Sequence, residues 1–264
     1  METATIILTI FAITYIGIAM GRIPGLKLNR AGIALLGAIG MAVFGGVTTT
    51  DAVSYVNWPT IFLLFGFFVI SAQLRLSGFY DKVAGVIAGR LGHPARFLFI
   101  LMAVTGGLSA FLNNDIVCFV FTPIVCAALL RKQINPVPFL IALAISSNLG
   151  AAWTLVGNPQ NMMIGQIAHL DFSRYLLWSS VPVIFAMCAA YGIIWLLSRK
   201  HLQTSPSAQN ESAQQTYPFD RIHTVKGIII LVTVIGLFFT SLPREVIALA
   251  AAGIHLASTK FRTE

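Results

Sequence analysis

The sequence predicts an all-α polytopic membrane protein, and three observations support this fold class. Apolar residues make up 57% of the 264 residues, and charged residues only 10%. The apolar residues form several runs of about 17 to 25, the length that crosses a bilayer core. The basic residues lie between these runs and form no continuous stripe, so the net charge of +8 indicates a membrane topology and no nucleic-acid partner.

Hydropathy predicts the elements in chain order. The first, residues 3–20, we expect to remain as a span, because no basic residue precedes the apolar run and no small-residue cleavage site follows it. Two spans follow, at 31–49 and 58–76. The segment 97–130 returns to the side from which it enters, the segment 137–168 is long and interrupted, and 175–198 is a further span. Residues 199–225 are polar and are interpreted as a cytoplasmic linker. Apolar segments at 226–242 and 244–259 complete the pattern.

The distribution of Lys and Arg predicts the orientation of these spans. Alternating the loops between the two sides places 15 of the 17 basic residues on one side, and leaves only Arg174 and Arg244 on the other. Basic residues favour the cytoplasmic side. We therefore predict a multi-pass protein of the inner (cytoplasmic) membrane, with the N-terminus outside the cytoplasm.

Residues 97–130 can form either two short spans or a re-entrant hairpin, and both return to the cytoplasm. A turn within these 34 residues leaves about 15 per arm, which at about 1.5 Å per residue reaches about 23 Å. A bilayer core is about 30 Å thick, so length favours a hairpin whose tip stops inside the membrane. The polar tip is Asn113, Asn114 and Asp115.

Asp115 is the acidic residue that lies deepest within an apolar run. An intramembrane carboxylate is a functional-site hypothesis, because its ionisation there needs a cation, a proton or a dipole nearby. A structural role is compatible with this: Asn114 or Asp115 can cap the helix over residues 116–130. We expect no dedicated metal site, although a coupling cation near Asp115 remains open.

The segment 137–168 is too long for one simple span, and Gly157, Asn158 and Pro159 divide it. Asn before Pro is a favoured helix start, so a first half-helix is expected to end near Val156 and a second to begin at Pro159. At helical spacing Ser147, Gly150, Thr154 and Gly157 fall along one side. Ser146 and Ser147 suit either helix packing or a site, whereas the costly amides of Asn148 and Asn158 favour a site.

These two breaks carry a family resemblance. The stretch from Ser109 to Asp115, followed by Thr122 and Pro123, and the stretch from Asn148 to Asn161 resemble the ion transporter superfamily, in particular its arsenite-permease and citrate-permease-like anion transporters. The resemblance implies two inverted repeats, each with a re-entrant hairpin and a broken helix, and often dimerisation. It implies a substrate and ion site formed by Asn113, Asn114, Asp115, Asn148, Thr154, Gly157, Asn158 and Asn161.

The chain contains one hairpin and one break of this kind. On the resemblance, residues 1–198 form a first transporter repeat, and residues 226–264 form the start of an incomplete second repeat. The missing second motif implies either a truncated product or a partner that supplies the other half. The partner expected is therefore a second copy in a homodimer, as the resemblance implies, or a protein that supplies the second repeat.

The function predicted is secondary active transport of a small anion, with Na⁺ or H⁺ as coupling ion and no other cofactor. Three alternatives stay open: a cation/proton antiporter on the same scaffold, a pore, and a non-transporting membrane subunit. Catalysis has no support, since the sequence shows no Ser-His-Asp order, zinc spacing or phosphate-binding loop. Cys118, Cys126 and Cys188 lie within apolar runs without metal-ligand spacing.

Overall fold

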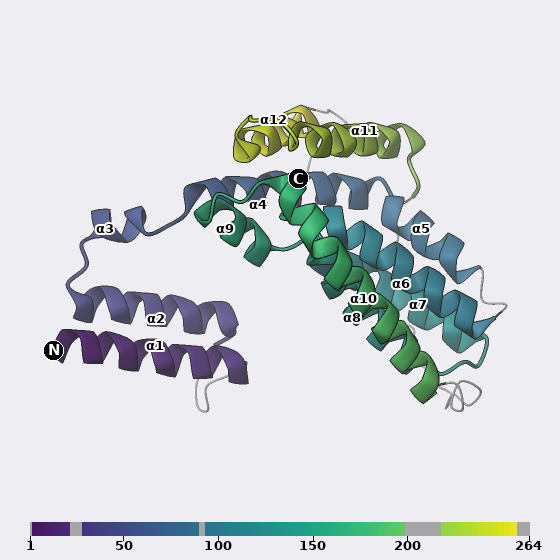
Figure 1. Cartoon of the computed structure of the whole chain (residues 1–264), viewed down its shortest axis with the longest axis horizontal. Helices are drawn as coiled ribbons and strands as arrows, with labels where there is room; N and C mark the ends of the chain where they lie inside the picture. Colours follow the sequence, from purple (N-terminus) through teal and green to yellow (C-terminus); the bar gives the residue numbers. More distant parts are fainter. Residues whose placement is uncertain (1, 22–27, 90–92, 199–217, 258–264) are drawn as a thin grey trace. The chain divides into compact units, whose positions relative to one another are not determined.

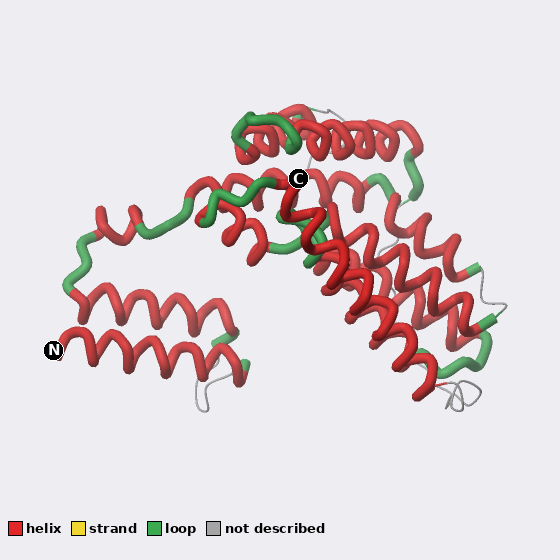
Figure 2. Tube along the Cα trace, viewed as in Figure 1, coloured by secondary structure: helices red, strands yellow, loops and turns green. Residues whose placement is uncertain are grey.

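The computed structural model describes residues 2–21, 28–89, 93–198 and 218–257, and every regular element in these ranges is an α-helix (Figures 1 and 2). The helices are α1 (Glu2–Met20), α2 (Arg30–Gly45), α3 (Thr49–Ser54), α4 (Trp58–Leu76), α5 (Phe79–Ala88), α6 (Pro94–Phe111), α7 (Asn114–Arg131), α8 (Val137–Ala151), α9 (Pro159–Ile167), α10 (Phe172–Ser198), α11 (Arg221–Leu237) and α12 (Arg244–Leu256). Four of them, α4, α6, α7 and α10, are long and apolar enough to cross a membrane. The predicted fold class of an all-α polytopic membrane protein is confirmed.

Two compact units make up the chain, and the first ends at Asn57. In this unit α1 and α2 pack against each other, with Gly37 facing the side chain of Thr14 so closely that a Cβ at Gly37 would lie 2.2 Å from the Thr14 hydroxyl. Asn29 caps α2 by accepting from Gly32 N–H at 2.9 Å. Thr48 caps α3 in the same way through Asp51 N–H.

The second unit begins at Trp58, and its centre is the contact between α6 and α8. Gly106 and Gly150 meet there, so that a Cβ at Gly150 would lie 2.1 Å from the Gly106 carbonyl oxygen. Small residues allow helix backbones in membranes to approach this closely. Helices α7 and α10 also pack on α8, and α5 packs on α7 (Figure 1).

Helix α4 is covered by α11 and α12 within this unit (Figure 1). Gly66 contacts Ala248 of α12, where a Cβ would lie 2.6 Å from the Ala248 Cβ. At the end of α4 the hydroxyl groups of Ser77 and Thr224 lie 3.0 Å apart. The end of α4 and the start of α11 are therefore packed together, and most of the predicted linker, residues 199–217, lies outside the described residues.

Several helix bounds differ from the sequence-based expectation; the expected span 31–49, for example, ends at Gly45. The arms of the 97–130 segment are 18 residues each, or about 27 Å at 1.5 Å per residue, and the expected 15 per arm was wrong. Helix α6 begins before the apolar run because Pro94 is favourable in a first helical turn. Helix α7 extends past the run because Arg131 is favourable in a last helical turn. Likewise α11 begins at Arg221, before Lys226, because Asp220 caps it.

Candidate functional site

The tip of the α6–α7 hairpin is a two-residue link. Leu112 leaves α6 in an extended conformation, and Asn113 starts α7 as its N-cap, with its side-chain oxygen accepting from Asp115 N–H at 2.8 Å. The expectation that Asn114 or Asp115 caps this helix was wrong. Both already belong to the first turn of α7, because the chain turns one residue earlier than the apolar pattern indicated.

The tip is bonded to α8 through polar groups. The Ser109 and Ser147 hydroxyl groups lie 2.8 Å apart, and Ser147 donates to the Asn114 carbonyl oxygen at 3.1 Å. The Asn114 amide donates to the Asn148 side-chain oxygen at 3.4 Å. These bonds hold the predicted tip residues against the predicted break residues.

A second hydroxyl pair lies one helical turn closer to the start of α6, away from the tip. Thr105 and Ser146 are both buried, and their hydroxyl oxygens lie 2.6 Å apart. Together with Gly106, Thr105 was missed by sequence reasoning. The signal was present in the spacing of Thr105 and Ser109, which places two hydroxyl groups on one face of α6 opposite the Ser146 and Ser147 pair.

The break in the second segment is longer than expected. Helix α8 ends at Ala151, not near Val156, and α9 begins at Pro159 as predicted. Ser147 and Gly150 lie on α8, but Thr154 and Gly157 lie in the irregular stretch, so the expected single helical row of four was wrong. The physical reason is that Gly157 folds back onto α8, where a Cβ at Gly157 would lie 2.2 Å from the Ala151 carbonyl oxygen.

The freed backbone groups of the break are bonded by its own side chains. Asn161 donates to the carbonyl oxygens of Ala151 at 3.2 Å and Thr154 at 2.9 Å. Asn158 caps α9 by accepting from Asn161 N–H at 2.7 Å. The Thr154 hydroxyl donates to the Ala110 carbonyl oxygen of α6. Irregular backbone at membrane depth requires hydrogen-bond partners for its N–H and C=O groups. Thr154 and Asn161 provide such partners and therefore have a structural role.

Helix α10 also contacts the break, through residues that the sequence did not single out. Ser179 donates to the Trp153 carbonyl oxygen at 2.6 Å, and the Trp153 indole N–H donates to Ser180 at 2.7 Å. Tyr175 donates to the Ala152 carbonyl oxygen at 3.2 Å. The position of the break is therefore fixed from both α6 and α10.

The predicted site residues fall into three classes of exposure. Asp115 and Asn148 are exposed, whereas Asn113 and Asn114 are buried and Asn158 and Asn161 are half-buried. A carboxylate and a carboxamide thus face the outside of this unit at the end of the hairpin, supported by a buried amide and hydroxyl network. In the described ranges no three His, Cys, Asp or Glu side chains gather as a metal site.

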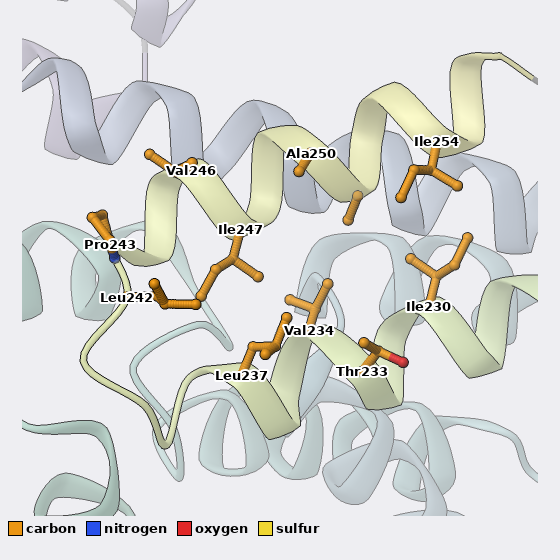
Figure 3. Close-up of a pocket in the computed structure, with 11 residues that line it drawn as sticks. Ile230, Thr233, Val234, Leu237, Leu242, Pro243, Val246, Ile247, Ala250 and Ile254 are labelled. Carbon is orange, nitrogen blue, oxygen red and sulfur yellow. The ribbon is translucent and has the colours of Figure 1, made fainter.

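Two cavities in the second unit are apolar, and the first of them adjoins the break. One, of about 410 Å³, is lined by residues of α6, α8 and α10 together with Trp153. The other, of about 450 Å³, lies between α11 and α12, where Val234 and Leu237 face Val246 and Ile247 (Figure 3). The Thr233 hydroxyl in its wall donates to the Ile229 carbonyl oxygen at 2.8 Å. Neither lining resembles a site for a charged solute, because it offers almost no polar group.

Comparison with known proteins finds one family model and several relatives named as transporters. The model, described as citrate transporter, matches residues 7–262. An uncharacterized transporter of Mycobacterium tuberculosis (strain CDC 1551 / Oshkosh) is 31% identical over 261 residues, 94% of this chain and 60% of the relative. A silicon efflux transporter of Oryza sativa subsp. japonica is 33% identical over 66% of this chain and 35% of the relative. A transporter of Dictyostelium discoideum named arsB is 30% identical over 73% and 34%. The chain thus spans about a third to three fifths of the length of these relatives.

Proposed function

The chain belongs to the citrate transporter family, and from this premise we propose that it is a secondary active transporter, or the N-terminal half of one, that moves a small anion across the cytoplasmic membrane. Its membership of a transporter family and its apolar helices make it a multi-pass membrane protein. The proposal includes three further points: that the substrate is an anion, that the membrane is the inner membrane, and that the N-terminus lies outside the cytoplasm.

The observation that carries this proposal is a pair of capped helix starts that are both hydrogen-bonded to the last turn of α8. Asn113 starts α7 and Asn158 starts α9, and hydrogen bonds link the first turn of α7 to α8 and Asn161 of α9 to the end of α8. Helix N-termini present N–H groups and a positive dipole end, which favour anions. Secondary transporters place such half-helices at their substrate sites.

Asp115 supplies the proposed coupling group. Asp115 is exposed in the first turn of α7, and its neighbour in sequence, Asn114, donates to the exposed Asn148. A carboxylate and an amide oxygen are hard ligands suited to Na⁺, and the carboxylate can instead take up a proton. This exposure also favours a second candidate function, a cation/proton antiporter in which Asp115 binds the transported cation.

The re-entrant hairpin and the second repeat are also proposals. Arms of about 27 Å fit either a hairpin inside the membrane or two short crossings, so the polar tip is the main argument for the hairpin. We propose that α11 and α12 open a second repeat, and that a second copy or a partner completes the site. Their apolar groove (Figure 3) is compatible with further helices packing there.

The test is Asp115→Asn in protein reconstituted into liposomes, with citrate, phosphate and sulfate as anions and fluxes of Na⁺ and H⁺ measured in parallel. Under anion transport the variant keeps anion binding, because the helix starts remain, but loses its dependence on the cation or proton gradient. Under antiport it loses cation-dependent proton flux with no anion present. Gradient dependence equal to that of the unmodified protein would refute a coupling role for Asp115.

A further inference from the structure

A third cavity lies between α5 and α6, and its lining includes none of the predicted site residues. Its volume is about 250 Å³. Five apolar side chains and one cation line it: Val83, Val86, Ile87, Ile100, Val104 and Lys82. Helix α5 packs more closely on α7 than on α6, and the cavity lies on the side of α5 that is less tightly packed.

Helix α5 buries one face and exposes the other. Tyr80, Ala84 and Ile87 are buried and fall on one face at helical spacing. Lys82 and Val86 are exposed one turn apart on another face. A helix with an apolar face and a basic residue on its exposed face is typical of the boundary between a membrane and water.

The walls of the cavity favour an acyl chain as its occupant. Val86 is 50% exposed, and Phe99, which precedes Ile100 on α6, is 59% exposed. The cavity therefore adjoins an apolar surface, which in a multi-pass membrane protein faces the acyl chains of the bilayer. Water is a poor occupant, because a bound water needs two to four polar partners and the five apolar walls offer it none.

The cation in the lining favours an anionic headgroup. The Lys82 ammonium lies 5.8 Å from the centre of the Phe219 ring, a cation–π contact that positions the ammonium and uses none of its three N–H donors. Asp81 precedes Lys82, but adjacent residues of a helix do not face each other. Arg96 is exposed one turn before Ile100 on the same face of α6 and adds a second positive charge.

We propose that this cavity binds an anionic phospholipid, with an acyl chain against the apolar walls and the phosphate on Lys82. Basic pockets between membrane helices bind anionic lipid headgroups in this way. The inference concerns a second site, and it does not depend on which solute the protein transports. The competing explanation is that Lys82 only packs on Phe219 and that the cavity accepts an acyl chain with any headgroup.

The experiment compares phosphatidylglycerol with phosphatidylcholine of the same acyl chains, titrated into the purified full chain in detergent and measured by native mass spectrometry. Phosphatidylglycerol should bind about fivefold more tightly, the contribution of one basic residue near an anionic headgroup. Lys82→Gln should remove this preference and leave phosphatidylcholine binding unchanged. Lys132→Gln is the matched control, because Lys132 is an exposed lysine at the end of α7 and outside the cavity lining; it should keep the preference.

A second variant tests the acyl chain. Val104→Phe places a larger side chain in the α6 wall of the cavity and should weaken the binding of both lipids by a similar factor. If this variant fails to fold, Ile100→Phe fills the same cavity one turn earlier. Unchanged binding of both lipids in the folded variant would overturn the assignment of the cavity.

The headgroup assignment fails on three other outcomes. Equal affinity of the two lipids for the unmodified protein would refute it, as would an equal loss of the preference in Lys82→Gln and Lys132→Gln. Inorganic phosphate is the third probe: if it displaces phosphatidylglycerol, the site binds a small oxyanion and the lipid proposal is wrong. A negative result in the Asp115→Asn flux assay leaves these measurements unaffected, because Asp115 is outside the cavity lining.

Discussion

The contact between Gly150 and Gly106 predicts that a single methyl group will separate α6 from α8. A Cβ added at Gly150 would lie 2.1 Å from the Gly106 carbonyl oxygen and 2.5 Å from its carbonyl carbon. All the nearby atoms are backbone, so no side chain can move aside. Relief to a normal contact of about 3.4 Å requires the helices to part by about 1.3 Å.

This separation breaks the hydroxyl pairs beside the contact. Thr105 with Ser146 and Ser109 with Ser147 are now 2.6 and 2.8 Å apart, and an added 1.3 Å takes both beyond about 3.5 Å, where a hydrogen bond is lost. Overpacking costs about 1–3 kcal/mol, and each lost bond about 0.5–1.5 kcal/mol. Gly150→Ala should therefore lower the free energy of unfolding by about 2–6 kcal/mol.

The assay is thermal unfolding of the protein in detergent, where this loss corresponds to a fall in Tm on the order of 10 °C. Gly107→Ala is the matched control, because a Cβ at Gly107, the next residue along α6, meets nothing within 4 Å. Its Tm should stay the same or rise slightly, since Ala favours helix by about 1 kcal/mol. If the two variants melt within about 2 °C of each other, which corresponds to less than about 1 kcal/mol, the helices separate without cost and the reasoning is wrong.

Three further predictions follow from the site and the topology. Asn161→Ala should destabilise the protein by about 1–3 kcal/mol because the Ala151 and Thr154 carbonyl oxygens lose their donor; the exposed neighbour variant Gln160→Ala should not, and equal Tm values would contradict this. Asn113→Ala should cost about 1 kcal/mol through loss of the α7 cap, whereas Asn113→Asp retains an acceptor and should melt close to the unmodified protein. Cysteines at Lys132 and Asp171 should label from the cytoplasm and from outside, respectively; labelling of both from one side would refute the predicted orientation.

The sequence by itself determined the fold class and the positions of the chain breaks. The apolar runs require helices, because no other open structure satisfies its backbone groups in lipid. Asn158 before Pro159 specified the start of α9, since this pair can hardly occupy a helix interior. The polar tip at Asn113, Asn114 and Asp115 was found in the same way, because such residues are costly in an apolar run. These are local properties, and they can be read along the chain.

Only the tertiary structure decided which residues meet. The early end of α8 at Ala151 depends on Asn161 reaching back across the break, and the tip's contact with α8 depends on Gly106 and Gly150. The approach of Arg75 to Phe119 joins residues 44 positions apart. Hydropathy and helix period do not predict which of these segments contact each other, because both patterns record only whether a helix face is apolar. The neighbour that an apolar helix face packs against is decided only in the folded chain.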